Sequence, residues 1–211
     1  RGFFQMIFAA GLSLPLVYAA SFAAGPEGAR STTALRTLMA AQLGLTALVL
    51  ASAVWRLGLY MRAYGLTEDR LYGGAVLLWI AVIIAVFVIT VLRGRPTGAV
   101  FGTIVAAVVV LAVLNLVNPA ALVARYNLSH QERRAADVKY LARLGADAVP
   151  VLVARLDDVA QEERCELAAT LVRRYGASPR DWRGWNLARW RAEQSVARLT
   201  SFIESCSDRA R

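Results

Sequence analysis

The stretch Trp55-Arg-Leu-Gly-Leu-Tyr60-Met-Arg-Ala-Tyr-Gly65-Leu-Thr-Glu-Asp-Arg70-Leu-Tyr72 is a polar island that joins two long apolar segments. Gly65 suits the left-handed end of one helix, and Thr67 can cap the next. Glu68 and Asp69 then favour the positive end of that second helix. We therefore predict a tight helix hairpin at the membrane–water interface. Its candidate functional residues are Arg62, Tyr64, Gly65, Thr67 and Arg70.

Four apolar segments surround this island, at about residues 3–24, 35–59, 71–92 and 97–117. Each is long enough to cross about 30 Å of hydrocarbon as a helix. The last is rich in valine, but a segment of this length in lipid must satisfy its backbone internally, which favours a helix. The sequence thus predicts an all-α fold in which residues 1–119 form four transmembrane helices.

Charge marks a second, water-facing domain over residues 120–211. This region holds 16 Lys and Arg and 12 Asp and Glu, against 8 and 3 in residues 1–119. Ser129-His-Gln-Glu132 has the capping-box pattern, so we predict a helix from there to Gly145. Further helices are expected after a cap at Asp147, with Pro150 in the first turn, then up to Tyr175 before Gly176, after Ser178-Pro179, and along an amphipathic face from Trp185 to Cys206. The paired short helices resemble HEAT-style repeats, but such arrays usually need three units, so a small helical bundle is predicted.

The net charge of +9 is almost entirely due to arginine. If the four crossings alternate, eight basic residues lie on the side of the tail and four on the other, which favours a cytoplasmic tail. We expect the lipid bilayer and its anionic lipids as partners. Nucleic acid is disfavoured because the tail is only +4 and mixes both signs. For Trp182, Trp185 and Trp190 we favour packing in the tail core over contact with a membrane.

The residues needed for catalysis or metal binding are scarce. One histidine, His130, and two distant cysteines cannot supply the usual ligands of a zinc site. His130 is expected in the exposed first turn of the predicted 129–145 helix. No nucleophile-elbow, P-loop or dinucleotide-binding pattern occurs. The sequence therefore predicts no catalytic residues, no metal and no cofactor.

Cys165 and Cys206 both fall on apolar faces of predicted helices. They are either two buried thiols that pack as small apolar groups or a disulfide between two tail helices. The disulfide requires an oxidising compartment, which contradicts a cytoplasmic tail.

Several stretches occur together in one order along the chain. They are Arg1-Gly-Phe-Phe-Gln5, Arg56-Leu-Gly-Leu-Tyr60, Tyr64-Gly-Leu-Thr67 with Arg70 and Trp79, Asn118-Pro119, Asn127-Leu128, Tyr140-Leu-Ala-Arg-Leu-Gly-Ala-Asp-Ala-Val-Pro150 and Asp181-Trp-Arg-Gly-Trp-Asn186. In this set the chain resembles the bacterial multi-pass membrane proteins of domain-of-unknown-function family 4173, which is close to family 4153. The resemblance implies a bacterial inner-membrane protein and implies no activity. In such proteins the Arg-Gly-Phe-Phe stretch is internal, so we expect this chain to be a C-terminal fragment that packs against upstream helices.

The leading functional hypothesis is a non-enzymatic membrane module whose tail contacts lipid or a protein partner. A part of a transporter is the first alternative, although the apolar segments offer few polar groups for a transport path. A membrane-tethered sensor or signalling component, with the tail as its sensing or output domain, is the second.

Overall fold

The computed structural model describes residues 33–92, 97–130, 137–176, 183 and 185–209, with residues 5, 8, 12, 16 and 19. Every regular element in this part of the chain is a helix, as the sequence predicts. Two compact units are present. The first comprises Arg1–Tyr64 and Asp69–Leu116, and the second comprises Gly65–Glu68 and Val117–Arg211. The turn of the predicted hairpin, Gly65–Glu68, thus belongs to the same unit as the tail.

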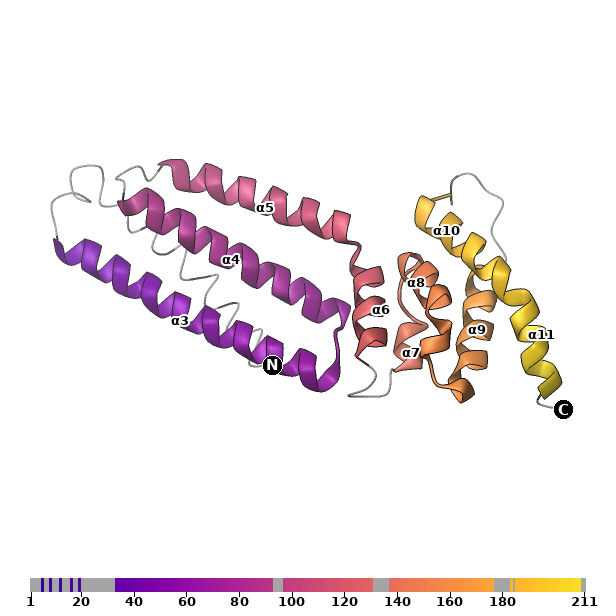
Figure 1. The fold of residues 1–211 in the computed structure, drawn as a ribbon. Helices are drawn as coiled ribbons and strands as arrows, with labels where there is room; N and C mark the ends of the chain where they lie inside the picture. Colours follow the sequence, from indigo (N-terminus) through magenta and orange to yellow (C-terminus); the bar gives the residue numbers. More distant parts are fainter. Residues whose placement is uncertain are drawn as a thin grey trace. The chain divides into compact units, whose positions relative to one another are not determined.

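The first unit contains three long apolar helices, α3 (Thr33–Tyr64), α4 (Glu68–Leu92) and α5 (Thr97–Val117) (Figure 1). Each contains a segment long and apolar enough to cross a membrane: Ala40–Tyr64, Glu68–Ile89 and Val100–Val117. These correspond to the last three predicted spans. The first predicted span, at 3–24, lies outside the described residues apart from five single positions, which are helical. Four spans therefore remain a prediction.

A buried apolar seam joins α3 and α4. On α3 the buried leucines recur every seven residues, with Ala53 between the last two of them. On α4 the buried residues are spaced alternately by three and four. Both spacings are those of a coiled-coil seam. The buried members are Leu43, Leu50, Ala53, Leu57, Leu77, Ile80, Ile84 and Phe87. The turn at residues 65–67 therefore returns the chain against itself as a helical hairpin.

Helix α5 approaches α4 at a small residue. A Cβ added to Gly102 would lie 2.7 Å from Val86 Cγ1, so glycine is required for this close approach. One turn later Ala106 is buried, and the Trp79 indole N–H donates to the Thr103 carbonyl at 3.4 Å. The small residues Gly102 and Ala106 thus lie where α5 comes close to α4. At Gly44, in contrast, an added Cβ would meet nothing within 4 Å.

The described part of the second unit contains six short α-helices. They are α6 (Pro119–Ser129), α7 (Val138–Leu141), α8 (Val149–Ala154), α9 (Gln161–Tyr175), α10 (Leu187–Val196) and α11 (Thr200–Arg209), with short 3-10 turns at Ala146–Ala148, Leu156–Asp158 and Ala197–Leu199. Their shared core is aliphatic, with Val123, Leu141, Leu152, Leu167, Leu171 and Val196 fully buried. A small helical bundle describes this unit, and its likeness to HEAT repeats remains a prediction.

Asn118 and Pro119 begin a helix that the sequence analysis missed. Asn118 adopts the left-handed conformation at φ 56°, and its side-chain oxygen accepts a hydrogen bond from the Ala121 N–H at 3.4 Å. Asparagine is among the few residues that tolerate this conformation, and proline suits the first helical position. The pair therefore ends α5 and at once caps α6.

The predicted capping box at Ser129 is wrong. Ser129 is the last residue of α6, and His130 follows as its C-terminal cap rather than lying in a first turn. The Ser129 hydroxyl donates to the Tyr126 carbonyl at 3.0 Å, and so binds back into the helix that precedes it. Residues 131–136 are outside the described part, and the next described helix, α7, is capped by Asp137, which accepts from the Tyr140 N–H at 2.9 Å.

Two further boundaries differ from the prediction. Asp147 does not cap α8, because it lies within a 3-10 turn and Ala148 precedes the helix, with Pro150 in the first turn as expected. The long amphipathic helix expected from residue 185 is divided into α10 and α11 by the turn at Ala197–Leu199, where Thr200 Oγ1 donates to the Ala197 carbonyl. The predicted end of α9 at Tyr175, before Gly176, is confirmed. The start predicted at Ser178-Pro179 lies outside the described residues.

Candidate functional site: the hairpin turn held by the tail

The turn between α3 and α4 begins at a glycine in the left-handed region of the backbone. Helix α3 ends at Tyr64, Gly65 has φ 74°, and α4 begins at Glu68, directly after Thr67. A residue with a Cβ is disfavoured by about 1–2 kcal/mol in this left-handed region. The left-handed stop predicted at Gly65 is therefore present.

Leu66, in the middle of the turn, is held at both of its main-chain polar groups by one side chain. Its N–H donates to Asn127 Oδ1 at 2.9 Å, and its carbonyl accepts from Asn127 Nδ2 at 2.7 Å. The Leu66 residue is only 5% exposed. A side-chain amide carries its donor and its acceptor on separate atoms, so it can bind the N–H and the carbonyl of one buried residue at the same time. We call this pair of hydrogen bonds the Asn127 clamp.

A second tail residue holds the start of α4. The Glu68 N–H donates to the Tyr140 hydroxyl at 3.0 Å, across a sequence separation of 72 residues. The first N–H groups of a helix have no partner within the helix, and this hydroxyl satisfies one of them. Asn127 on α6 and Tyr140 on α7 thus bind two residues that are close in the turn.

Within the first unit, Arg70 packs onto the end of α3. Its Nη1 donates to the Tyr64 carbonyl at 3.2 Å, and its guanidinium lies 5.7 Å from the centre of the Tyr64 ring. The bond satisfies one of the carbonyls that a helix end leaves without a partner. Arg62 lies exposed in the last turn of α3, where positive charge complements the helix dipole. Of the five candidate residues, Arg70 and Tyr64 are thus brought into direct contact.

The clamp constrains the topology of the membrane helices. Asn127 and Leu66 are separated along the chain by α4 and α5, and both helices are long and apolar enough to cross a membrane. Two crossings return the chain to the side from which it started. The turn and the tail helices that bind it therefore lie on the same side, in agreement with the alternation used to count basic residues.

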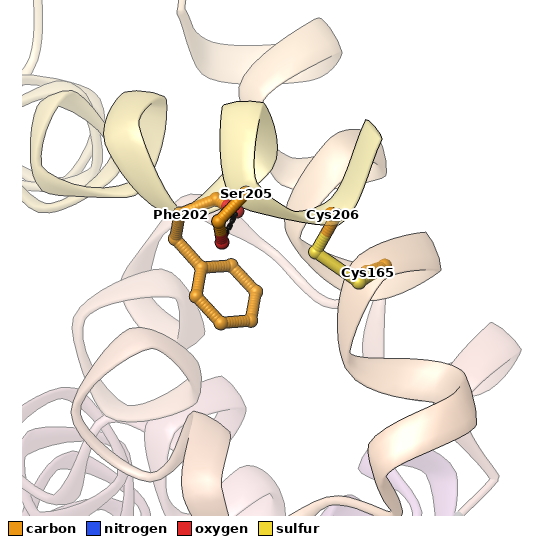
Figure 2. Close-up of a disulfide and its surroundings, with 4 residues drawn as sticks. All are labelled: Cys165, Phe202, Ser205 and Cys206. Atoms are coloured by element: carbon orange, nitrogen blue, oxygen red, sulfur yellow. Dashed lines mark hydrogen bonds between the residues drawn. A yellow bond between two sulfur atoms is a disulfide. The ribbon is translucent and has the colours of Figure 1, made fainter. Parts of the chain in front are cut away.

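The two cysteines form a disulfide that joins α9 to α11, as Figure 2 shows. Cys165 and Cys206 are half-buried, with their Cα atoms 6.0 Å apart and a sequence separation of 41. The bond fixes the last described helix to the bundle. Of the two alternatives that the sequence left open, the structure contains the disulfide.

The tryptophans described by the structure do not pack in the tail core. Trp185 is 66% exposed and Trp190 is 46% exposed, with Leu187 exposed between them. Trp182 lies outside the described residues. The preference for core packing is therefore wrong at these two positions, and we call the three exposed side chains the Trp185–Trp190 patch.

The remaining polar residues do not assemble a metal site in the described ranges. No group of three or more His, Cys, Asp or Glu that could hold a metal occurs there. His130 stacks on the Tyr126 ring with centroids 4.3 Å apart, and its Nδ1 lies 2.9 Å from the Tyr126 carbonyl. These contacts hold His130 against the last turn of α6, where it is the C-terminal cap.

Long apolar helices with membrane-crossing length, followed by a small helical bundle, define a membrane protein of the helical class. The family model for the domain of unknown function DUF4153 matches residues 1–154, which include α3 to α8. The chain belongs to the DUF4153 family. No curated protein and no solved structure matches it. The finer resemblance to family 4173 and a bacterial origin remain predictions.

The two tail residues that hold the turn, Asn127 and Tyr140, were not among the predicted site residues. Asn127 and Tyr140 were named only among the residues that carry the family resemblance. A mid-helix asparagine is a weak signal on its own, because its partner at Leu66 is 61 residues away. The turn itself was found because glycine, threonine and the acidic pair are local signals.

Proposed function

We propose that this chain is a non-enzymatic membrane module that couples a transmembrane hairpin to a water-facing helical domain. The Asn127 clamp is the observation that carries the proposal. One side chain satisfies both main-chain polar groups of the buried Leu66. Displacing the turn from Asn127 would leave these two groups without partners, which is unfavourable. A displacement of the turn is therefore expected to move α6 with it.

The long apolar helices support the membrane role of the module. On α5, Phe101, Leu111 and Leu116 are among many large side chains exposed over its whole length. Such a surface suits lipid tails or further transmembrane helices. We propose that upstream helices of a longer protein cover part of it and that lipid covers the rest.

The Trp185–Trp190 patch supports an interaction role for the tail. Exposed indole rings beside arginines, here Arg189 and Arg191, suit the headgroup region of an anionic membrane. The same chemistry suits an acidic protein surface. We propose anionic lipid as the first partner of this patch and a protein as the second.

We propose the bacterial inner membrane as the location, and two observations bear on the side of the tail. The arginine distribution favours the cytoplasm. The Cys165–Cys206 disulfide favours an oxidising compartment outside it. In intact cells a membrane-impermeant reductant followed by a membrane-impermeant thiol reagent labels the cysteines only when the tail is outside. The same treatment after permeabilisation provides the control.

Hydrogen exchange tests the coupling in the full-length protein reconstituted into nanodiscs. In Asn127→Ala, we expect faster exchange both in the turn around Leu66 and in α6. Asn115→Ala is the matched control. Asn115 is an exposed asparagine whose amide donates within its own helix α5, to the Leu111 carbonyl. Faster exchange in the turn alone, with α6 unchanged, contradicts the coupling.

Solute flux separates the module from the transporter alternative. In proteoliposomes that contain the full-length protein, we expect no flux above that of empty liposomes for inorganic ions, amino acids and sugars. Saturable flux that Asn127→Ala abolishes and Asn115→Ala preserves would replace the proposed function with transport.

A further inference from the structure

A cavity of about 490 Å³ opens between α7 and α9 in the second unit. Its polar lining is dominated by four basic side chains: Lys139, Arg143, Arg173 and Arg174. Glu166 and Thr170 on α9 complete the polar lining. The formal charge around the cavity is therefore +3.

Arg174 is held in place before any ligand binds. Its Nη1 donates to the Ala142 carbonyl at 3.1 Å and to the Leu144 carbonyl at 3.4 Å. Its guanidinium also lies 5.3 Å from the centre of the Tyr175 ring. A guanidinium has five N–H donors, and these bonds involve only one of its three nitrogens. The group can therefore bind an anion at little further loss of side-chain freedom.

The ordinary explanation covers only part of the cluster. Arg173 and Arg174 lie in the last turn of α9, where positive charge complements the helix dipole. Lys139 lies in the last turn of α7 and Arg143 follows that helix, but α7 has only four residues and therefore a small dipole; both side chains reach the same cavity from this different segment. Like charges gathered in this way repel one another, and a bound anion relieves the repulsion.

We propose that this cavity binds a phosphate-bearing anion, either a soluble phosphate ester or the headgroup of an anionic phospholipid. Arginine forms paired hydrogen bonds with phosphate oxygens, and lysine adds a compact positive charge. The cavity is large enough for a phosphate with a small substituent, and the Thr170 hydroxyl adds a neutral donor in the wall. The site is separate from the Trp185–Trp190 patch and from the Asn127 clamp.

The test uses the full-length protein in nanodiscs, with two soluble probes and one lipid probe. Inorganic phosphate and glycerol phosphate are titrated calorimetrically against protein in phosphatidylcholine nanodiscs. Short-chain phosphatidylglycerol is titrated in the same way to represent the lipid source. Saturation with the soluble probes identifies a soluble ester, and saturation only with phosphatidylglycerol identifies a headgroup; either outcome supports the site.

Charge variants locate the binding. We expect Arg143→Gln with Arg173→Gln to weaken the saturating probe at least tenfold. The matched control is Arg191→Gln with Arg198→Gln, which removes the same charge from exposed positions outside the cavity and should change affinity less than twofold. Equal weakening by both double variants shows binding to general surface charge and overturns the proposal.

Glu166→Gln keeps the test valid if the double variant folds poorly. Because this change removes the negative charge in the lining, we expect about threefold tighter binding of the same probe. Unchanged or weaker binding, or no saturable binding of any probe by the unaltered protein, overturns the proposal. None of these variants alters the Asn127 clamp, so failure here leaves the coupling function intact.

Discussion

Asn127 binds Leu66 from 61 residues away, accepting from its N–H at 2.9 Å and donating to its carbonyl at 2.7 Å. Buried main-chain N–H and carbonyl groups usually find their hydrogen-bond partners in a helix or a β-sheet. At Leu66 one side chain supplies both partners. It gives the turn between two apolar helices a fixed partner in the helical tail.

Asn127→Ala should lower the free energy of unfolding by about 2–3 kcal/mol, because both polar groups of a buried peptide lose their partner. Thermal unfolding of the protein in nanodiscs measures the change. Asn115→Ala removes an exposed bond within one helix and should change stability by less than about 0.5 kcal/mol. Similar losses in the two variants would count against a special role for the clamp.

Gly65→Ala and Gly58→Ala should change stability in opposite directions. At Gly65 the positive φ makes alanine unfavourable by about 1–2 kcal/mol. Gly58 lies within α3 with nothing within 4 Å of an added Cβ, so alanine there should stabilise by about 0.5–1 kcal/mol. Denaturant unfolding of both variants in one detergent makes the comparison. A stabilised Gly65→Ala would show that the left-handed turn is absent.

Gly102→Ala should loosen the contact between α4 and α5. An added Cβ would lie 2.7 Å from Val86 Cγ1, and overpacking of this kind typically destabilises by about 1–3 kcal/mol. Gly44→Ala is the control, because its added Cβ meets nothing within 4 Å. Melting temperatures of the two variants decide the matter, and a larger drop for Gly44→Ala would contradict this packing.

Reduction of the Cys165–Cys206 disulfide should destabilise the tail by about 4 kcal/mol, since the bond closes a loop of 41 residues. Hydrogen exchange in α11 should rise most, because the bond is its covalent tie to α9. The Cys165→Ser, Cys206→Ser double variant should behave like the reduced protein and should not respond to reductant. If reductant raised exchange in the double variant equally, the effect would lie outside the disulfide.

The features that the sequence predicted well are those with local signals. Three apolar spans were found from length and lack of charge, and Gly65 from its residue type and flanks. Local signals also misled where two patterns compete at one place. Ser129 fits the start of a helix. However, Asn118 and Pro119 start α6 earlier in the chain, and Ser129 is the last residue of that helix. The Trp185–Trp190 patch was misassigned because helical spacing shows which residues share a face and does not show which face is covered.

The partners in the candidate site could not be predicted in this way. A single asparagine at position 127 does not identify a peptide 61 residues earlier. The Tyr140 hydroxyl likewise binds the Glu68 N–H from 72 residues away. Both contacts depend on how two segments meet in space, which no local period or cap pattern encodes.

The Asn127 clamp also sets an order of events during synthesis. Leu66 leaves the ribosome well before Asn127, and α4 and α5 are made between them. The clamp can close only if both intervening helices cross the membrane or neither does, since a chain that missed one crossing would leave Asn127 on the opposite side of the membrane from Leu66. The clamp therefore forms only after the turn and the tail have reached the same side. A chain that missed one crossing would leave the Leu66 N–H and carbonyl without Asn127.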